Sequence, residues 1–480
     1  MKNSDQIWDL VDHRRQTFVE LADRVWDTPE LNYGEFRSSD SHAAVLTGTG
    51  FRLSRGIGGI PTALLGEAGE GGPVIAILGE YDALPGLSQE AGIAEERPLV
   101  AGGNGHGCGH NLLGTAALQA ATAVKDWLAQ TGLPGRVRYY GCPAEEGGSA
   151  KGFMVREGLF DDVDIAISWH PGPFTCVMYP ASLACVEVLF HFTGRAAHAA
   201  AAPHLGRSAL DAVELMNVGV NYMREHMPST ARIHYALIDA GGVAPNVVQA
   251  KATVRYLVRA RELDEMQALF ERVKKVAEGA ALMTETTVVC EPVSGEANLL
   301  GNDALEALMQ RELERLGPAA FDDADREIAA KFHATFNPED IATCFATYRL
   351  QPEEGLVLCD RILPLDSGDP ALIGSTDVGT VSWAVPTVQM YGATCAIGTP
   401  PHSWQMVAQG KLPLAHKGME HAAKIMASTA AALIRDPALV EQAKADHGTR
   451  RRGRPLANPL THGVAPALVP APAGWSFAAP

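Results

Sequence analysis

Several features that would identify common classes of protein are missing from this sequence of 480 residues. No stretch approaches the roughly 18 to 20 consecutive apolar residues that a membrane-spanning helix needs. The first residues, MKNSDQIWDLVDHRRQ, are charged and lack the apolar core of a secretory signal peptide. We therefore expect a cytoplasmic protein that has no membrane partner.

Positive charge is also scarce. Lysine and arginine together number 39 against 56 aspartates and glutamates, so the formal net charge is −17. A surface that binds nucleic acid normally carries an excess of positive charge, because it must neutralise phosphates. The charge therefore argues against nucleic acid as a partner and favours a small molecule or another protein.

The cysteines do not suggest a disulfide framework. Eight of them are scattered between residues 108 and 395 without regular spacing, and a chain of this length can bury a core without covalent links. We expect reduced thiols, of which only Cys108 has neighbours that suggest a chemical role. The sequence also has no HExxH zinc helix, and GGSAK at 147–151 lacks the second glycine of a nucleophile elbow, which argues against a serine hydrolase.

The apolar pattern of the first part of the chain predicts an α/β fold. Residues 5–27 carry apolar side chains at helical spacing. Continuous apolar runs follow, and they are separated by helical segments such as 112–128; the runs lie at 74–78, 137–140 and 164–168. Continuous apolar strands between helices are typical of a mainly parallel sheet that is covered on both faces.

Near residue 183 the pattern changes to alternating apolar and polar residues, as in a strand with one buried face. Two helical segments and three more strand-like segments follow, at 208–225, 232–238, 247–258, 262–283 and 286–290. This composition is typical of a small α+β domain inserted into a larger one. We therefore predict a main domain at 1–182 and 295–445 and an inserted domain at 183–294.

Two segments carry little regular pattern. Residues 342–372 are rich in Pro, Asp and Gly and predict irregular structure, whereas 414–433 predict a long Ala-rich helix. The tail at 446–480 is first basic and then rich in Pro and Ala, so we expect it to be poorly ordered.

The segment GGNGHGCGHNLLG at 102–114 is the most unusual part of the chain. In extended backbone, residues two apart project to the same side, so Cys108 and His110 can reach one point while the glycines between them allow close approach. This arrangement suits metal ligands. A glycine-rich loop with incidental Cys and His, or a phosphate cradle, remains the alternative, although the segment lacks the Lys-Ser/Thr of a phosphate-binding loop.

Other candidate ligands follow apolar strands, where α/β sheets place their sites. The segment GCPAEEGG contains Glu145 and Glu146, which form either a solvated acidic turn or a proton acceptor beside a metal ligand. His170 ends an apolar strand, and His402 lies in the loop GTPPHSW; each alone is more simply a surface histidine. Five candidate ligands exceed what one tetrahedral metal needs and suggest two ions that share a ligand. Asp82, in GEYDALPG, is either a turn residue or a carboxylate that orients a ligating histidine.

With these segments, the chain resembles the aminoacylase and glutamate carboxypeptidase family of metallopeptidases, in the branch of auxin-conjugate amidohydrolases and hippurate hydrolases. The resemblance runs from the first helix to about residue 440 and includes GEYDALPGLSQ, NGHGCGHNLLGTAA, GCPAEEGGS, FMVREG, PNVVQA, STDVG and HSWQ. It implies a catalytic α/β domain carrying two divalent ions, manganese or zinc, and an inserted lid domain that dimerises.

The resemblance also implies roles for individual residues. Glu145 would be the general base, and the metal ligands would be Cys108, His110, Glu146, His170 and His402. His198, in GRAAHAA of the inserted domain, would reach the active site of a partner subunit and hold the oxyanion. Asn246 and Arg259 match positions that bind the amide and the carboxylate of the substrate. Without the resemblance, His198 would be taken for a strand-end histidine and Arg259 for a solvated cation.

The implied activity is hydrolysis of the amide bond of an N-acyl amino acid, with p-aminobenzoyl-glutamate as the first expectation. Other aromatic or auxin-type conjugates, or removal of an aryl amino group, are alternatives within the enzyme class. A non-catalytic binding subunit on the same fold is the alternative outside it, and the presence of Glu145 with every candidate ligand argues against that. We expect either a homodimer or a heteromer with a homologous subunit.

Overall fold

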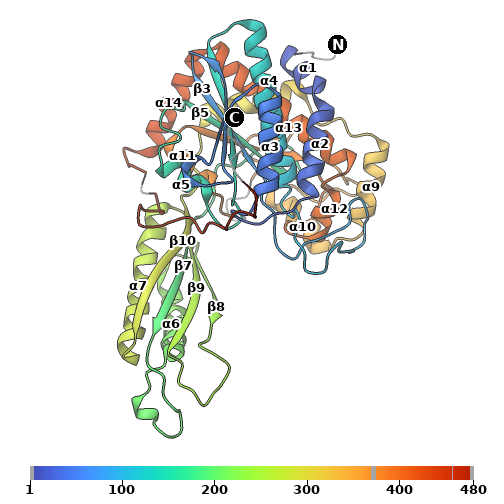
Figure 1. Cartoon of the computed structure of the whole chain (residues 1–480). Coiled ribbons are helices and arrows are strands. Elements are labelled where there is room, and N and C mark those ends of the chain that lie inside the picture. Colours follow the sequence, from blue (N-terminus) through green and yellow to red (C-terminus); the bar gives the residue numbers. More distant parts are fainter. Residues whose placement is uncertain (1–4, 369–373, 457, 476–480) are drawn as a thin grey trace.

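The protein is described by a computed structural model that covers residues 5–368, 374–456 and 458–475 (Figure 1). Its strands form two separate sheets, one of seven strands and one of four. Within the described residues, no helix is both long enough and apolar enough to cross a membrane.

The seven-stranded sheet has the order β1-β2-β4-β3-β5-β11-β6. The four strands β4, β3, β5 and β11 run parallel to one another. The strands β1 and β6 form the two edges, and β2 lies between β1 and β4 and is antiparallel to both. The strands are β1 Arg52–Arg55, β2 Leu64–Glu70, β3 Val74–Glu80, β4 Gly135–Cys142, β5 Ile165–Gly172, β6 Cys176–Val177 and β11 Thr387–Ala393. The predicted α/β class with a mainly parallel central sheet is confirmed.

Helices cover both faces of this sheet, which explains why β3 is buried along its whole length. Ile75 and Ile77 belong to the apolar cluster that includes α4 and α13, whereas Ala76 and Leu78 point to the opposite cluster with α5 and α11. The helices of this part are α1 Gln6–His13, α2 Arg15–Trp26, α3 Phe36–Gly48, η1 Ile57–Gly59, α4 His110–Thr131, α5 Ala150–Arg156, α8 Asp303–Leu316, α9 Asp323–His333, α10 Pro338–Thr347, α11 Val378–Ala384, α12 Trp404–Gln409, α13 Pro413–Arg435 and α14 Pro437–Arg451. The parallel strands therefore have the two-sided cover that continuous apolar runs require.

The four-stranded sheet is antiparallel in the order β10-β7-β9-β8 and packs against two helices. Its elements are β7 Ala184–Thr193, η2 Pro203–Leu205, α6 Ala209–Met223, η3 Arg224–His226, β8 Arg232–Asp239, β9 Lys251–Ala260, α7 Leu263–Thr284 and β10 Thr287–Glu296. Alternate side chains of β7, such as Val188 and Phe190, are buried under α6 and α7. Figure 1 shows this sheet extending away from the seven-stranded sheet.

Two helices differ from the sequence-based expectations. The first helix is interrupted at Arg14, which separates α1 from α2. Residues 342–372, expected to be irregular, include the second half of α10, and 369–373 lie outside the described residues. Helix α10 forms because Pro338 occupies its first turn and Asn337 and Asp340 complete a capping box.

The expectation of a poorly ordered tail does not match the described residues beyond 445. Helix α14 continues to Arg451, and Leu460 is fully buried in the cluster around α5. Asn458 donates a hydrogen bond to the carbonyl of Gly152, and the Trp475 ring lies edge-on to Phe36 at 4.7 Å. A few apolar anchors thus hold a segment whose overall composition is typical of disorder, while Ala457 and 476–480 lie outside the described residues.

Candidate active site

The candidate site lies at the carboxyl ends of the parallel strands β3, β4 and β5, beside the start of α4. His110 is the first residue of α4, and His170 lies near the end of β5. Glu145 and Glu146 follow β4 directly. Because the carboxyl ends of parallel strands share one edge of a sheet, segments far apart in the sequence meet there.

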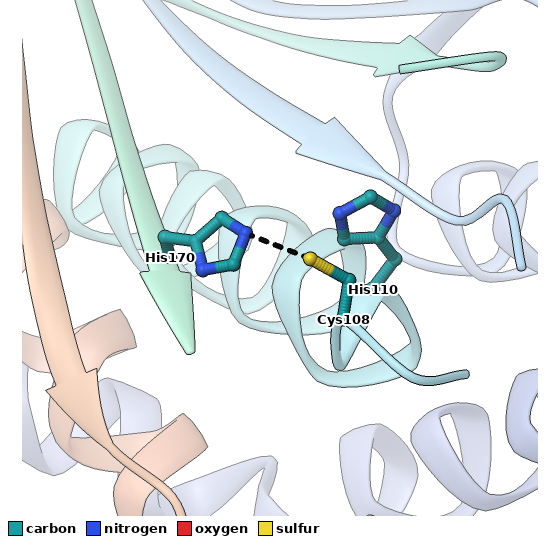
Figure 2. A group of neighbouring side chains, drawn as sticks. All are labelled: Cys108, His110 and His170. Atoms are coloured by element: carbon teal, nitrogen blue, oxygen red, sulfur yellow. Dashed lines mark hydrogen bonds between the residues drawn. The ribbon is translucent and has the colours of Figure 1, made fainter. Parts of the chain in front are cut away.

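Cys108, His110 and His170 form a first group of possible metal ligands (Figure 2). The Cys108 Sγ lies 3.3 Å from His170 Nε2, and one ligand atom from each of the three residues lies within 4.8 Å of the others. Gly109 has a φ of +78°, and a Cβ there would come within 3.0 Å of the Pro171 ring. Glycine between the two ligands is therefore required by both backbone conformation and space.

Cys108, Glu146 and His402 form a second group within the same distance of one another. His402 Nε2 lies 3.6 Å from the Glu146 Oε2, and the backbone N–H of His402 donates to the carbonyl of Gly107 at 3.0 Å. His402 has a φ of +54°, an unfavourable value for a residue with a side chain, which often marks a functional position. The five predicted ligands thus come together in two groups that share Cys108.

The donor set fits a pair of divalent cations. His110 Nε2 and Glu146 Oε1 are buried, and neither atom has a hydrogen-bond partner among the residues that the structure describes. A buried nitrogen and a buried carboxylate oxygen without hydrogen-bond partners are costly unless something binds them. Thiolate, imidazole and carboxylate groups are the ligands that zinc and similar metals prefer. A thiolate common to both groups is suited to bridge two ions.

Asp82 holds two of these ligands in place. Its Oδ1 lies 2.9 Å from His110 Nδ1, and its Oδ2 accepts a hydrogen bond of 2.9 Å from the backbone N–H of Glu146. Burial raises the pKa of Asp82, but the charge and the hydrogen bond of His110 outweigh burial, so this pKa lies below its usual value. Asp82 therefore stays ionised and directs His110 Nε2 toward the candidate centre.

Glu145 has the surroundings that a proton-transferring carboxylate needs. Burial raises the pKa of Glu145 well above its usual value, and neighbouring carboxylates, Glu80 first among them, raise it further. One carboxylate oxygen of Glu145 lies within 4.8 Å of ligand atoms of Glu80 and His110. A raised pKa favours a group that first accepts and then returns a proton near neutral pH.

Sequence analysis missed three charged residues that lie beneath the site. Lys151 Nζ lies 2.6 Å from the Glu80 Oε1 and 2.5 Å from the Asp377 Oδ1, and all three side chains are buried. The Glu80 Oε2 in turn lies 3.3 Å from His110 Nε2. Glu80 could have been found from its spacing to Asp82 at the end of β3, because residues two apart lie on the same side of an extended segment. No local sequence pattern pointed to Asp377, because its partner Lys151 lies 226 positions away in the sequence.

His198 and Asn246 are not brought to this group by the single chain. His198 is exposed and pairs through its backbone with Val247, and the carbonyl of Asn246 accepts from Ala199 N–H in the same loop region. Arg259, at the end of β9, does approach the site. It lines a cavity of about 430 Å³ together with Glu145 and Glu146, and its buried Nε has no partner among the described residues.

Comparisons with known proteins agree with this geometry. Residues 76–351 match the family model of peptidase family M20/M25/M40. The chain is 46% identical over 469 residues to one subunit of the p-aminobenzoyl-glutamate hydrolase of Escherichia coli, covering 95% of this chain and 97% of that protein. It is 32% identical to another subunit of the same hydrolase over 45% of this chain and 51% of that protein. A dinuclear metal-binding peptidase of Bacillus subtilis has the same fold, with a TM-score of 0.52, 16% identity and coverage of 86% of this chain and 99% of its own.

Proposed function

The chain belongs to peptidase family M20/M25/M40, and on this premise we propose that it hydrolyses p-aminobenzoyl-glutamate to p-aminobenzoate and glutamate. Family membership and the hydrolase relatives make it a metal-dependent amidohydrolase that uses divalent metal ions. The observation that carries the proposal is the convergence of five ligands in two groups around Cys108, with Glu145 beside them. The substrate is proposed from the relative that matches almost the whole chain.

Cys108, His110 and His170 would hold one ion, and Cys108, Glu146 and His402 the other. When bound, the two divalent ions supply Lewis acidity for the scissile carbonyl and lower the pKa of nearby water. The combination of one thiolate with imidazoles and carboxylates suits zinc, and manganese is the second candidate. Metal analysis of the purified protein distinguishes the two.

Glu145 would carry the proton through the reaction. Its carboxylate accepts a proton from the attacking water and then returns it to the amide nitrogen of the departing glutamate. Asp82 fixes the orientation of His110 during both steps, because its two oxygens are held by His110 and by the backbone of Glu146. Turnover thus needs no protein nucleophile.

Arg259 would bind a carboxylate of the glutamate half. It shares the polar cavity with Glu145, and Arg255 on the same strand brings a second guanidinium to that cavity. Arg255 already pairs with Glu187 at 3.4 Å, and Glu145, Glu146 and Glu296 also line this cavity, so Arg259 is the cation proposed to receive the acidic substrate. His198 and Asn246 would complete the site from a second chain, with His198 stabilising the oxyanion.

The surface of the four-stranded sheet supports pairing with such a chain. Strand β8 is an edge strand whose Tyr235, Leu237 and Ile238 are exposed. Exposed apolar edge strands normally find a partner strand. The partner is a second copy of this chain or a homologous protein, because two different subunits of one hydrolase are both similar to this chain.

A substrate panel on purified protein loaded with zinc or manganese tests the proposal. We expect p-aminobenzoyl-glutamate to have the highest kcat/KM, ahead of benzoyl-glycine and an indole-acetyl amino acid. Faster hydrolysis of an auxin-type conjugate would replace the proposed substrate. Release of ammonia from an arylamine would indicate an aminohydrolase, and tight binding without turnover in the metal-loaded protein would indicate a binding subunit.

A further inference from the structure

A cavity of about 350 Å³ adjoins the candidate centre and shares no lining residue with the polar cavity of Arg259. Cys108 and His170, both candidate metal ligands, form part of its wall. The other cavity also reaches the centre, through Glu146, so the two halves of a substrate cleaved at the centre would extend into the two cavities. The chemistry of the lining residues bears on which half of the substrate lies there.

One face of α10 forms a wall of this cavity. Asp340, Thr343, Cys344 and Thr347 line it, and their spacing places all four on the same side of the helix. The helix is fixed on the core by Phe345, whose ring lies 5.6 Å from that of Phe174 in an edge-on arrangement. The wall is thus part of the folded core and not a free loop.

Aromatic rings also line this cavity and continue from the candidate centre to the end of α10. The ring of Tyr391 is edge-on to that of His170, with 6.0 Å between centroids, and edge-on to that of Tyr348, at 5.8 Å. Aromatic rings prefer edge-on and offset contacts with one another. A flat aromatic group entering from His170 would therefore meet favourable partners along its length.

The volume of this cavity and the charge of its lining residues also indicate which half of the substrate it binds. A cavity of about 150 Å³ is enough to bind benzene, so 350 Å³ accommodates a substituted benzoyl group. Among the lining residues that the structure describes, Asp340 alone carries a formal charge, apart from the candidate ligands. A glutamate dianion would lose its hydration here without gaining a cation, whereas the other cavity offers Arg259, beside an Arg255 that pairs with Glu187 at 3.4 Å.

We propose that this cavity binds the aromatic acyl group of the substrate and that the Thr343 face of α10 limits the size of the ring it accepts. The proposal rests on the proposed function and extends it, because it assigns the aryl half to one cavity and the glutamate half to the other. Thr343 acts here as a specificity-determining residue, since its side chain lines the cavity without belonging to the candidate centre.

The test is a substitution that fills the cavity, made at the exposed lining residue Thr343. Thr343→Phe places a ring in the cavity, and Ala346→Phe adds the same ring to an exposed position of α10 that does not line it. Metal-loaded protein is assayed with p-aminobenzoyl-glutamate and with N-acetyl-glutamate, whose acyl group is small. Thr343→Phe is expected to lower kcat/KM for the aromatic substrate by about tenfold or more while changing the acetyl substrate less than about twofold. Ala346→Phe is expected to leave both unchanged.

Calorimetric binding of p-aminobenzoate separates this proposal from the proposed function. The wild type should bind p-aminobenzoate, and Thr343→Phe should weaken binding by a similar factor of about ten. If the wild type cleaves no p-aminobenzoyl-glutamate, the proposed function fails, and the binding result still decides the role of the cavity. Equal affinity in both proteins, no binding by the wild type, or an equal loss for both substrates would overturn the assignment.

Discussion

The two sheets of this protein contribute to the reaction in opposite ways. The seven-stranded sheet gathers Cys108, His110, Glu145 and their neighbours into a partly buried group within one chain. The four-stranded sheet leaves His198 and Asn246 in two exposed loops that pair with each other, away from that group. We therefore propose that metal binding and proton transfer depend on the single fold, whereas oxyanion stabilisation depends on association between chains.

The largest effect is expected from Cys108, because both groups of ligands contain it. Cys108→Ala should remove the shared ligand of both ions and lower kcat/KM by at least about 10⁴-fold, since Lewis acidity and an activated water are lost together. Elemental analysis should show loss of metal in the same sample. The matched control is Cys290→Ala on the four-stranded sheet, which should keep metal content and activity. Full metal content in Cys108→Ala would refute the shared-ligand assignment.

Glu145 tests whether proton transfer can be separated from metal binding within the same sheet. Glu145→Gln preserves size but cannot accept a proton, so kcat should fall by about 10³-fold while metal content stays normal. Glu157→Gln, on an exposed carboxylate after α5, serves as the control and should behave as the wild type. A near-normal rate for Glu145→Gln would exclude Glu145 as the base.

His198 tests the contribution of the other sheet. His198→Ala should lower kcat by about 10²-fold without affecting metal content, as expected for loss of one oxyanion donor. In a homodimer, mixing inactive His198→Ala chains with inactive Glu145→Gln chains restores one complete site in each mixed dimer, or about a quarter of wild-type activity at equal mixing. Absence of recovery after exchange has been verified by mass spectrometry would contradict the role across chains.

The fold could largely be predicted from the sequence because local patterns of apolar residues indicate most of its strands and helices. Continuous apolar runs indicated β3, β4 and β5, and alternation indicated β7. The expectation of a poorly ordered tail rested on overall composition. Single side chains such as the buried Leu460 anchor this segment, and an average over the composition does not detect them. The second half of α10 was missed because it falls in 342–372, whose overall composition is irregular, whereas the proline and capping box that begin the helix, at Pro338 and Asn337/Asp340, lie just before that segment.

The candidate site was predictable only where unusual residues were also adjacent or followed strands. Cys108 and His110 could be recognised because they alternate with glycines, and His170 because it lies at the end of an apolar strand. Lys151 and Asp377 did not, because each looks like an ordinary surface residue until the fold buries them as a pair. Buried charges of this kind are set by long-range packing, which no local pattern encodes.

The smallest expected effect concerns the polar cavity between the two sheets and involves pH. Burial raises the pKa of Glu296 to about 7, although Ser149 donates a hydrogen bond of 2.7 Å to its carboxylate. Because the unfolded chain releases this proton near pH 4.5 and the folded chain only near pH 7, the folded state binds more protons in between, and its stability falls as pH rises. Glu296→Gln should remove this dependence and stabilise the protein by about 3 kcal/mol at pH 8 but not at pH 4. Melting temperatures measured across that range check the prediction, with the exposed Glu157→Gln as control. An equal shift at both pH values would show that the effect comes from packing and not from the proton, and the junction of the two sheets would then not respond to pH through Glu296.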